Sequence, residues 1–131
     1  MVVVDSSVLL DYLVGGGERV AWVERTFDEF AWNLHAPHLV DVEVAAVLRR
    51  LAAQKRLDPA GAAATLTVLQ HFRLVRYPHT GLLGRIWELR HTVTTYDAAY
   101  VALAEALDAP LLTTDGRLAR ASGPRVDVLT P

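Results

Sequence analysis

The sequence contains no cysteine, only one lysine, and no apolar run as long as a membrane span. Without cysteine, both a disulfide framework and a thiolate metal site are excluded. The longest apolar run begins at Ala98 and is interrupted by Glu105 and Asp108, short of the roughly 18 residues that a spanning helix needs. Only three valines separate Met1 from Asp5, which predicts no signal peptide. We therefore expect a cytoplasmic protein with no membrane association.

A strong excess of one charge is also missing. The chain has 13 basic and 15 acidic residues and a net charge of −2, which argues against binding nucleic acid by bulk electrostatics alone. Twelve of the basic residues are arginine, so a local basic face beside an acidic pocket stays open as an alternative. With 52% apolar residues in 131, the chain is long enough to bury about two-thirds of its unfolded surface. We expect one domain over residues 1–131.

What the sequence does contain is an alternation of short apolar runs with helical patterns. Strands separated by helices indicate crossover connections. We therefore predict an α/β fold, a three-layer α/β/α sandwich with a mostly parallel central sheet. The expected strands are residues 2–4, 74–77, 111–113 and 126–129; the expected helices are 6–14, 18–30, 38–54, 59–72, 79–90, 95–107 and 116–121.

Four carboxylates stand next to or inside apolar stretches. Asp5 ends the first strand, Glu43 lies within the helix of residues 38–54, Asp97 precedes a wholly apolar helical run, and Asp115 follows the run 109–114. A carboxylate on an apolar surface costs several kcal/mol unless it is paired or binds a cation. In parallel sheets, ligands bind at the carboxyl ends of the strands, where Asp5 and Asp115 are expected. We therefore predict one shared acidic site.

Each acid also has an alternative, purely structural role. Asp5 would cap the helix that starts at Ser6. Asp97 would interact favourably with the dipole of its helix from the first turn, and Asp115 with the following glycine would form a turn. For Glu43, the helical neighbours at i±3 and i±4 are all apolar, so its alternative is a solvated side chain at the edge of the apolar stripe. Asp41, on the other edge of that stripe, is expected to be a surface acid.

Clustered carboxylates suit Mg²⁺ or Mn²⁺, hard cations that prefer oxygen ligands and keep several waters. Such a site supports metal-assisted hydrolysis of a phosphodiester. The hydroxyls of Ser6, Thr113 and Thr114 lie beside the acids in the sequence. They would orient a carboxylate or a water, or would only cap a helix and fill a strand end.

With these residues in view, the chain resembles the PIN-domain family, specifically the VapC-type toxins of toxin–antitoxin pairs. The resemblance covers essentially the whole chain. It rests on VVVDSSVLL at residues 2–10, Glu43 in the helix after Pro37, TTYDAAYVALA at 94–104 and LTTD at 112–115.

That resemblance implies a Mg²⁺- or Mn²⁺-dependent endoribonuclease that cuts RNA, often in a tRNA or rRNA loop. It implies Asp5, Glu43, Asp97 and Asp115 as the catalytic, metal-binding acids, with Thr114 at the position of an assisting hydroxyl. It further implies a homodimer that a cognate antitoxin neutralises, in a heterotetramer or a larger complex.

Two alternatives belong to other functional classes. A receiver-type phosphoacceptor domain would need a lysine after a late strand, but the only lysine, Lys55, lies in a helical middle segment. A catalytically silent PIN-like module that binds RNA or protein is the second alternative, and the complete set of four acids argues against it.

Overall fold

The computed structural model describes residues 1–121 and 123–131. In these ranges one sheet of five parallel strands has the order β3-β2-β1-β4-β5. The strands are β1 (Val2–Val4), β2 (Leu34–Pro37), β3 (Val75–Tyr77), β4 (Leu111–Leu112) and β5 (Val128–Leu129). Val3 at the centre pairs with His35 on one side and Leu111 on the other. The predicted parallel sheet is confirmed.

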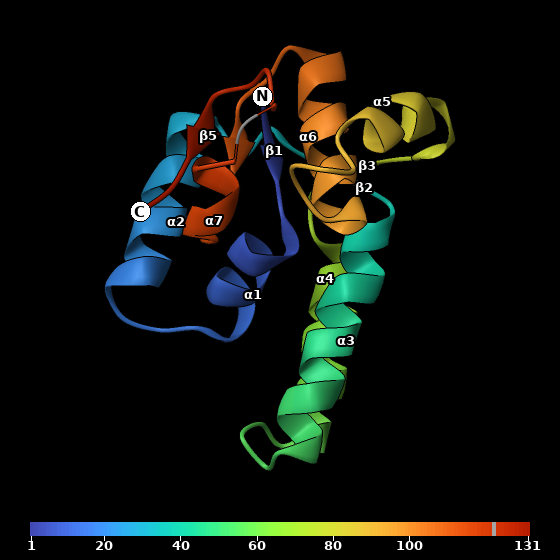
Figure 1. Ribbon diagram of the computed structural model, residues 1–131. Helices are drawn as coiled ribbons and strands as arrows, with labels where there is room; N and C mark the ends of the chain where they lie inside the picture. Colours follow the sequence, from blue (N-terminus) through green and yellow to red (C-terminus); the bar gives the residue numbers. More distant parts are fainter. Residues whose placement is uncertain (122) are drawn as a thin grey trace.

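Helices pack on both sides of this sheet. In the view of Figure 1, β1 lies between α5 and α6 on one side and α2 and α7 on the other, so the predicted three-layer sandwich is confirmed. The helices are α1 (Ser6–Val14), α2 (Glu18–Glu29), α3 (Leu39–Ala53), α4 (Pro59–His71), α5 (Leu83–Glu88), α6 (Thr95–Leu107) and α7 (Gly116–Ala119), with a 3₁₀ turn η1 (Thr80–Leu82). None of the helices in the described ranges is long and apolar enough to cross a membrane.

The core is centred on β1 and α6. All three valines of β1 are fully buried, because a central parallel strand is covered on both faces. Seven consecutive residues of α6, 98–104, are buried as well. Thr94 caps the start of this helix by accepting a hydrogen bond from the Asp97 N–H, and Asp108 ends it in the left-handed conformation. Because the residues that follow Asp97 are buried, this acid is held at the edge of the core, in the first turn of α6.

The α3–α4 hairpin extends away from the rest of the molecule (Figure 1). Asp58 caps α4 by accepting from the Gly61 N–H at 3.3 Å, and Pro59 opens the helix, as predicted. Arg76 on β3 joins the base of the hairpin to the sheet, since it pairs with Asp41 of α3 at 2.7 Å and donates to the Leu69 carbonyl at 2.8 Å. The expected surface acid Asp41 is thus partly exposed and ion-paired.

Strand β2 was not predicted, which is the main error of the sequence reading. Its four residues include His35 and Pro37, which have low strand propensity, although all four are buried. The His35 ring is satisfied in the core by the Tyr77 hydroxyl and the Asn33 side chain, both at 2.8 Å. Pro37 is the last residue of this strand and not, as expected, the start of the following helix, which begins at Leu39.

Other differences concern element ends. The expected helix 79–90 is divided into η1 and α5, and the last two strands have two residues each. The last expected helix, 116–121, ends at Ala119. Short elements have few hydrogen bonds of their own, so their ends depend on packing that a sequence pattern does not contain.

Candidate active site

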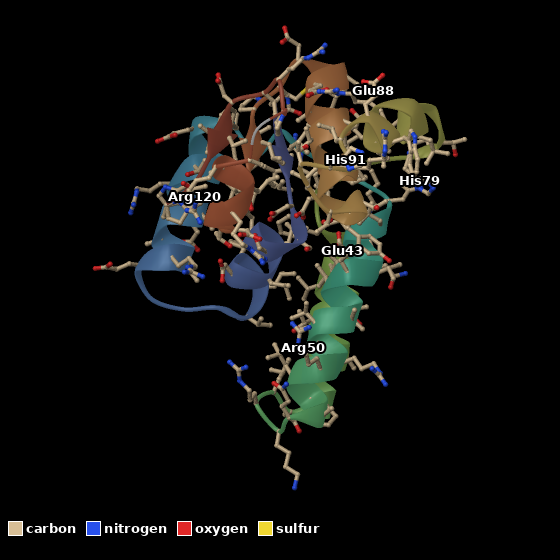
Figure 2. The ribbon with its side chains drawn as sticks, viewed as in Figure 1. Glu43, Arg50, His79, Glu88, His91 and Arg120 are labelled. Atoms are coloured by element: carbon tan, nitrogen blue, oxygen red, sulfur yellow. The ribbon has the colours of Figure 1, made fainter. Side chains whose placement is uncertain are left out.

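Two of the predicted acids lie at the carboxyl edge of the sheet, on neighbouring strands. Asp5 directly follows β1, and Asp115 comes three residues after β4. Helices bring the other two: Asp97 lies in the first turn of α6, and Glu43 lies in α3, which contacts α1. Figure 2 shows Glu43 near the end of α3 that faces the sheet.

Asp5 is buried, with only 6% of its surface exposed, and is held by three donors. Its Oδ1 accepts from the Ser7 hydroxyl at 2.5 Å and from the Val8 N–H at 3.1 Å, and its Oδ2 accepts from the Thr113 hydroxyl. The cap role considered for Asp5 is therefore present. A carboxylate has about four acceptor positions, so one position is left for a further ligand. Burial raises the pKa of Asp5, and the hydrogen bonds only partly oppose this.

Glu43 receives a hydrogen bond from the hydroxyl of Tyr100 on α6. Tyr100 is almost completely buried, with 1% of its surface exposed, and burial together with this bond raises its pKa, so it stays protonated and donates. Burial raises the pKa of Glu43, the bond from Tyr100 lowers it, and the charges of Asp5 and Asp97 raise it again. The partner of this glutamate thus comes from another helix.

Asp97 and Asp115 differ in their surroundings. Burial raises the pKa of Asp97, a hydrogen bond from Thr94 lowers it, and the charge of Asp115 raises it. Asp115 caps α7 by accepting from the Arg117 N–H at 2.9 Å, and its carboxylate pairs with the Arg117 guanidinium at 2.9 Å. These bonds lower the pKa of Asp115. Asp97 lies in the first turn of α6, as its structural alternative expected, whereas Asp115 caps a helix and does not form the expected turn with Gly116.

Mutual repulsion shows that the four acids share one electrostatic environment. Asp97 raises the pKa of both Asp5 and Glu43, and Asp115 raises that of Asp97. Within the described ranges, the ion pairs leave Asp5, Glu43 and Asp97 without a cationic partner. Repelling, partly buried carboxylates that lack a counter-charge are unfavourable unless a cation joins them.

The donor set fits a hard divalent cation. Its atoms are carboxylate oxygens, and Asp5 retains a free acceptor position. Across the residues described, there is no group of three acidic or histidine side chains placed to hold a metal ion. Mg²⁺ does not require one, since it usually keeps several waters and takes one or two carboxylates together with substrate phosphates. The residues therefore fit a cation of this class in an open site.

Of the three hydroxyls that we expected to orient a carboxylate or a water, that of Thr113 contacts an acid. Ser7 and Thr113 contact the Asp5 carboxylate, whereas Thr114 uses its backbone N–H to donate to Ser7 at 3.1 Å. Ser6 lies beside Tyr100, and a hydrogen bond from its side chain lowers the pKa of Tyr100, against the larger effect of burial. The supporting roles predicted for Ser6 and Thr114 stay predictions. Ser7 was not predicted as a support, and its only signal in the sequence is its position two residues after Asp5.

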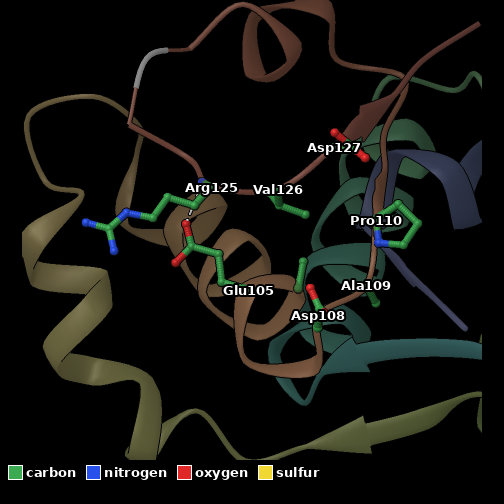
Figure 3. A pocket seen from close by; sticks show the side chains of 8 residues that line it. Glu105, Asp108, Ala109, Pro110, Arg125, Val126 and Asp127 are labelled. Atoms are coloured by element: carbon green, nitrogen blue, oxygen red, sulfur yellow. Dashed lines mark hydrogen bonds between the residues drawn. The ribbon is translucent and has the colours of Figure 1, made fainter.

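A hollow at the opposite edge of the sheet contains none of the four acids. It lies beside Pro110, which precedes β4, and Figure 3 shows the Arg125 N–H bonded to Glu105 there. Glu105 also pairs with Arg85 at 2.7 Å and accepts from Arg125 at 2.7 Å. Its carboxylate is therefore satisfied, and it ties the chain after α7 to α6. We assign this hollow a structural role.

Comparison with known proteins gives the same family for most of the chain. The model of the PIN domain matches residues 2–124. The chain is 45% identical over 118 residues to VapC ribonuclease Mb0985 of Mycobacterium bovis, covering 90% of this chain and 88% of that protein.

Solved structures give the same fold. VapBC2 from Rickettsia felis, bound to a promoter DNA fragment, matches with a TM-score of 0.74 at 13% identity, over 99% of this chain and 98% of that one. A toxin–antitoxin complex from Klebsiella pneumoniae matches with a TM-score of 0.65 at 18% identity, over 100% and 98%. At these identities, the two structures support the fold alone.

Proposed function

Since the chain belongs to the PIN-domain family, among its VapC ribonucleases, we propose that it is a Mg²⁺- or Mn²⁺-dependent endoribonuclease and the toxin of a toxin–antitoxin pair. One observation carries the metal dependence: three partly buried carboxylates repel one another at the carboxyl edge of the sheet, without a cationic partner among the described residues. Asp5, Glu43, Asp97 and Asp115 are the proposed ligands.

The protein's own contribution is to hold these acids in place. Ser7, Val8 and Thr113 fix both oxygens of Asp5, so its orientation is set before any ligand arrives. Tyr100 fixes one oxygen of Glu43. Preorganised oxygens of this kind lose little conformational entropy on binding a cation or a substrate. When bound, the divalent cation supplies Lewis acidity at the phosphodiester and lowers the pKa of a water at the site.

The raised pKa of the half-buried Asp97 describes the site without a cation. A cation binds the deprotonated carboxylate, so a bound cation would lower this pKa. We assign Asp97 the role of a ligand, like the other three acids.

The partners and the location follow from the family. The proposed substrate is RNA, with a tRNA or rRNA loop as the expected target, and a cognate antitoxin is the expected protein partner. We also propose that residues 1–131 form a single PIN-like domain, that the chain forms a homodimer, that the antitoxin complex is a heterotetramer or larger, and that the protein acts in the cytoplasm.

A cleavage assay tests the metal-dependent activity. Purified protein is incubated with structured RNA and either Mg²⁺ or Mn²⁺, with and without EDTA. We expect cleavage only with metal. Asp97→Asn should reduce the cleavage rate by at least about 100-fold, because replacing an outer-shell partner of a metal already costs about 10- to 100-fold and replacing a ligand should cost more. Asp108→Asn is the matched control, since it makes the same change at the exposed end of α6, where asparagine tolerates the left-handed conformation.

Cleavage that persists under chelation, or that survives Asp97→Asn, would remove the metal mechanism. An RNA-binding protein that takes up no Mn²⁺ in calorimetry and cuts nothing would instead support the catalytically silent module.

A further inference from the structure

Arg117 is the one cationic side chain of the described residues that ion-pairs with a candidate acid. Its Nη2 lies 2.9 Å from Oδ2 of Asp115, and its Nε lies 3.2 Å from Oδ1. The guanidinium side chain is 86% exposed, whereas that of Asp115 is 30% exposed. The positive charge also reaches Asp97. Arg117 therefore stands between the acidic site and solvent.

This pair can open at little cost. Among the described residues, the Arg117 side chain donates hydrogen bonds to Asp115 alone, two residues earlier in the chain. An ion pair in water contributes little stability. The arginines that hold the fold together are different. Arg76 and Arg85 each bind a carboxylate and a backbone carbonyl from separate elements. Arg117 is thus free to change partner without disturbing the fold.

A hollow lies beside this arginine. It has a volume of about 380 Å³ and is bounded by the loop after α5, the first turn of α6, and α7. The polar side chains on its wall are Arg90, His91, Thr92, Thr94, Asp97 and Arg117. Among these described side chains, Asp97 is the only acid, and the others can donate hydrogen bonds to an anion. The wall therefore suits a phosphate group next to the acidic site.

We propose that Arg117 is a positioning residue that exchanges Asp115 for a backbone phosphate of single-stranded RNA lying in this hollow. The inference rests on the proposed ribonuclease function. A guanidinium matches a phosphate through two parallel hydrogen bonds, as it does a carboxylate. Without RNA, Arg117 offsets one charge of the acidic cluster. With RNA, it turns to the phosphate and leaves the Asp115 oxygens free for the cation.

Two measurements on Arg117→Ala are expected to move in opposite directions. In the first, Mn²⁺ is titrated by calorimetry into metal-free protein in the absence of RNA. Removal of the competing guanidinium should tighten Mn²⁺ uptake by about two- to fivefold, the range of an exposed ion pair.

In the second measurement, RNA cleavage is followed at saturating Mn²⁺ over a range of salt concentrations. Arg117→Ala should raise KM by about 3- to 10-fold with a smaller effect on kcat, since a positioning contact is lost. The slope of log kcat/KM against log salt should shrink by about 0.7, which is one phosphate contact to a single strand. Arg117→Lys keeps the charge, so its salt slope should be close to that of the wild type, while its KM should stay above the wild-type value.

Arg19→Ala is the matched control, because it removes another exposed arginine that faces an acid, Asp11, at 3.7 Å on the α1–α2 side. It should change neither measurement. A merely structural role for Arg117 would weaken both Mn²⁺ uptake and cleavage.

Unchanged or weaker Mn²⁺ uptake in Arg117→Ala would overturn the exchange, and an unchanged KM and salt slope would overturn the phosphate contact. If the wild-type protein cuts RNA and Arg117→Ala has the same Mn²⁺ affinity, KM and salt slope, this inference alone is overturned. A wild-type protein that cuts no RNA would overturn the proposed function, and this inference with it.

Discussion

Tyr100→Phe isolates the contribution of one buried hydroxyl to the acidic site. Phenylalanine keeps the ring that α6 buries and removes only the donor to Glu43. A hydrogen bond to a charged group contributes roughly 1.5–3 kcal/mol. Glu43 is only half-buried, so water replaces part of this, and we expect a loss of about 1 kcal/mol. One pKa unit corresponds to about 1.4 kcal/mol, so the Glu43 pKa should rise by about 0.5–1 unit.

Calorimetric titration of Mn²⁺ between pH 5 and pH 8 measures this effect. A cation binds the deprotonated carboxylate, so the pH at which uptake reaches half its plateau should move upward by about 0.5–1 unit in Tyr100→Phe. Tyr96→Phe is the matched control, because it removes the hydroxyl of a tyrosine on the same helix that is 65% exposed. A midpoint that stays in place or moves to lower pH in Tyr100→Phe would refute the role assigned to this hydrogen bond.

Three further predictions concern stability. Asp97→Asn should leave the melting temperature of metal-free protein unchanged or raise it, because it removes a charge that the other acids repel; a clear decrease would favour a purely structural role. The pKa of Asp97 is raised in the folded protein, so its favourable contribution is lost as pH rises above about 4. The metal-free melting temperature of the wild type should therefore fall relative to that of Asp97→Asn as pH rises, and a difference that stays constant would contradict this. Thr113→Val should lower the free energy of unfolding in urea by about 1–3 kcal/mol, because Asp5 and the Asp115 N–H both lose a buried partner. Thr114→Val is the control and should change it by less than about 0.5 kcal/mol. Equal effects of the two changes would refute the supporting role of the Thr113 hydroxyl.

The strongest sequence patterns predicted their elements well. The apolar run after Asp97 gave α6 with the observed ends, and the apolar valines before Asp5 gave β1. Both elements are buried on nearly all sides, so a continuous apolar run in the sequence was enough to predict each of them. Strand β2 is an interior strand too, but the low strand propensity of His35 and Pro37 hides it in the sequence. Only the neighbouring strands, which supply its hydrogen bonds, make that segment a strand.

The acids of the candidate site and the hydroxyl of Thr113 could be named from the sequence, but which donor holds which acid could not. An acid beside an apolar run is visible in one segment of the chain. The donor that holds it comes from elsewhere, as with Thr113 to Asp5, 108 residues apart, and Tyr100 to Glu43, 57 residues apart. Arg117 was missed for another reason: in sequence it is one arginine among twelve, and only its exposed pair with Asp115 distinguishes it.

The central claim, that a divalent cation binds at the acidic site, is tested most directly by anomalous X-ray diffraction from crystals grown with Mn²⁺. We predict a peak at the carboxyl edge of the sheet, about 2.0–2.2 Å from an oxygen of Asp5 or Asp97, with the remaining ligands from the other acids or from water. A peak at any other place, or none at saturating Mn²⁺, would contradict it.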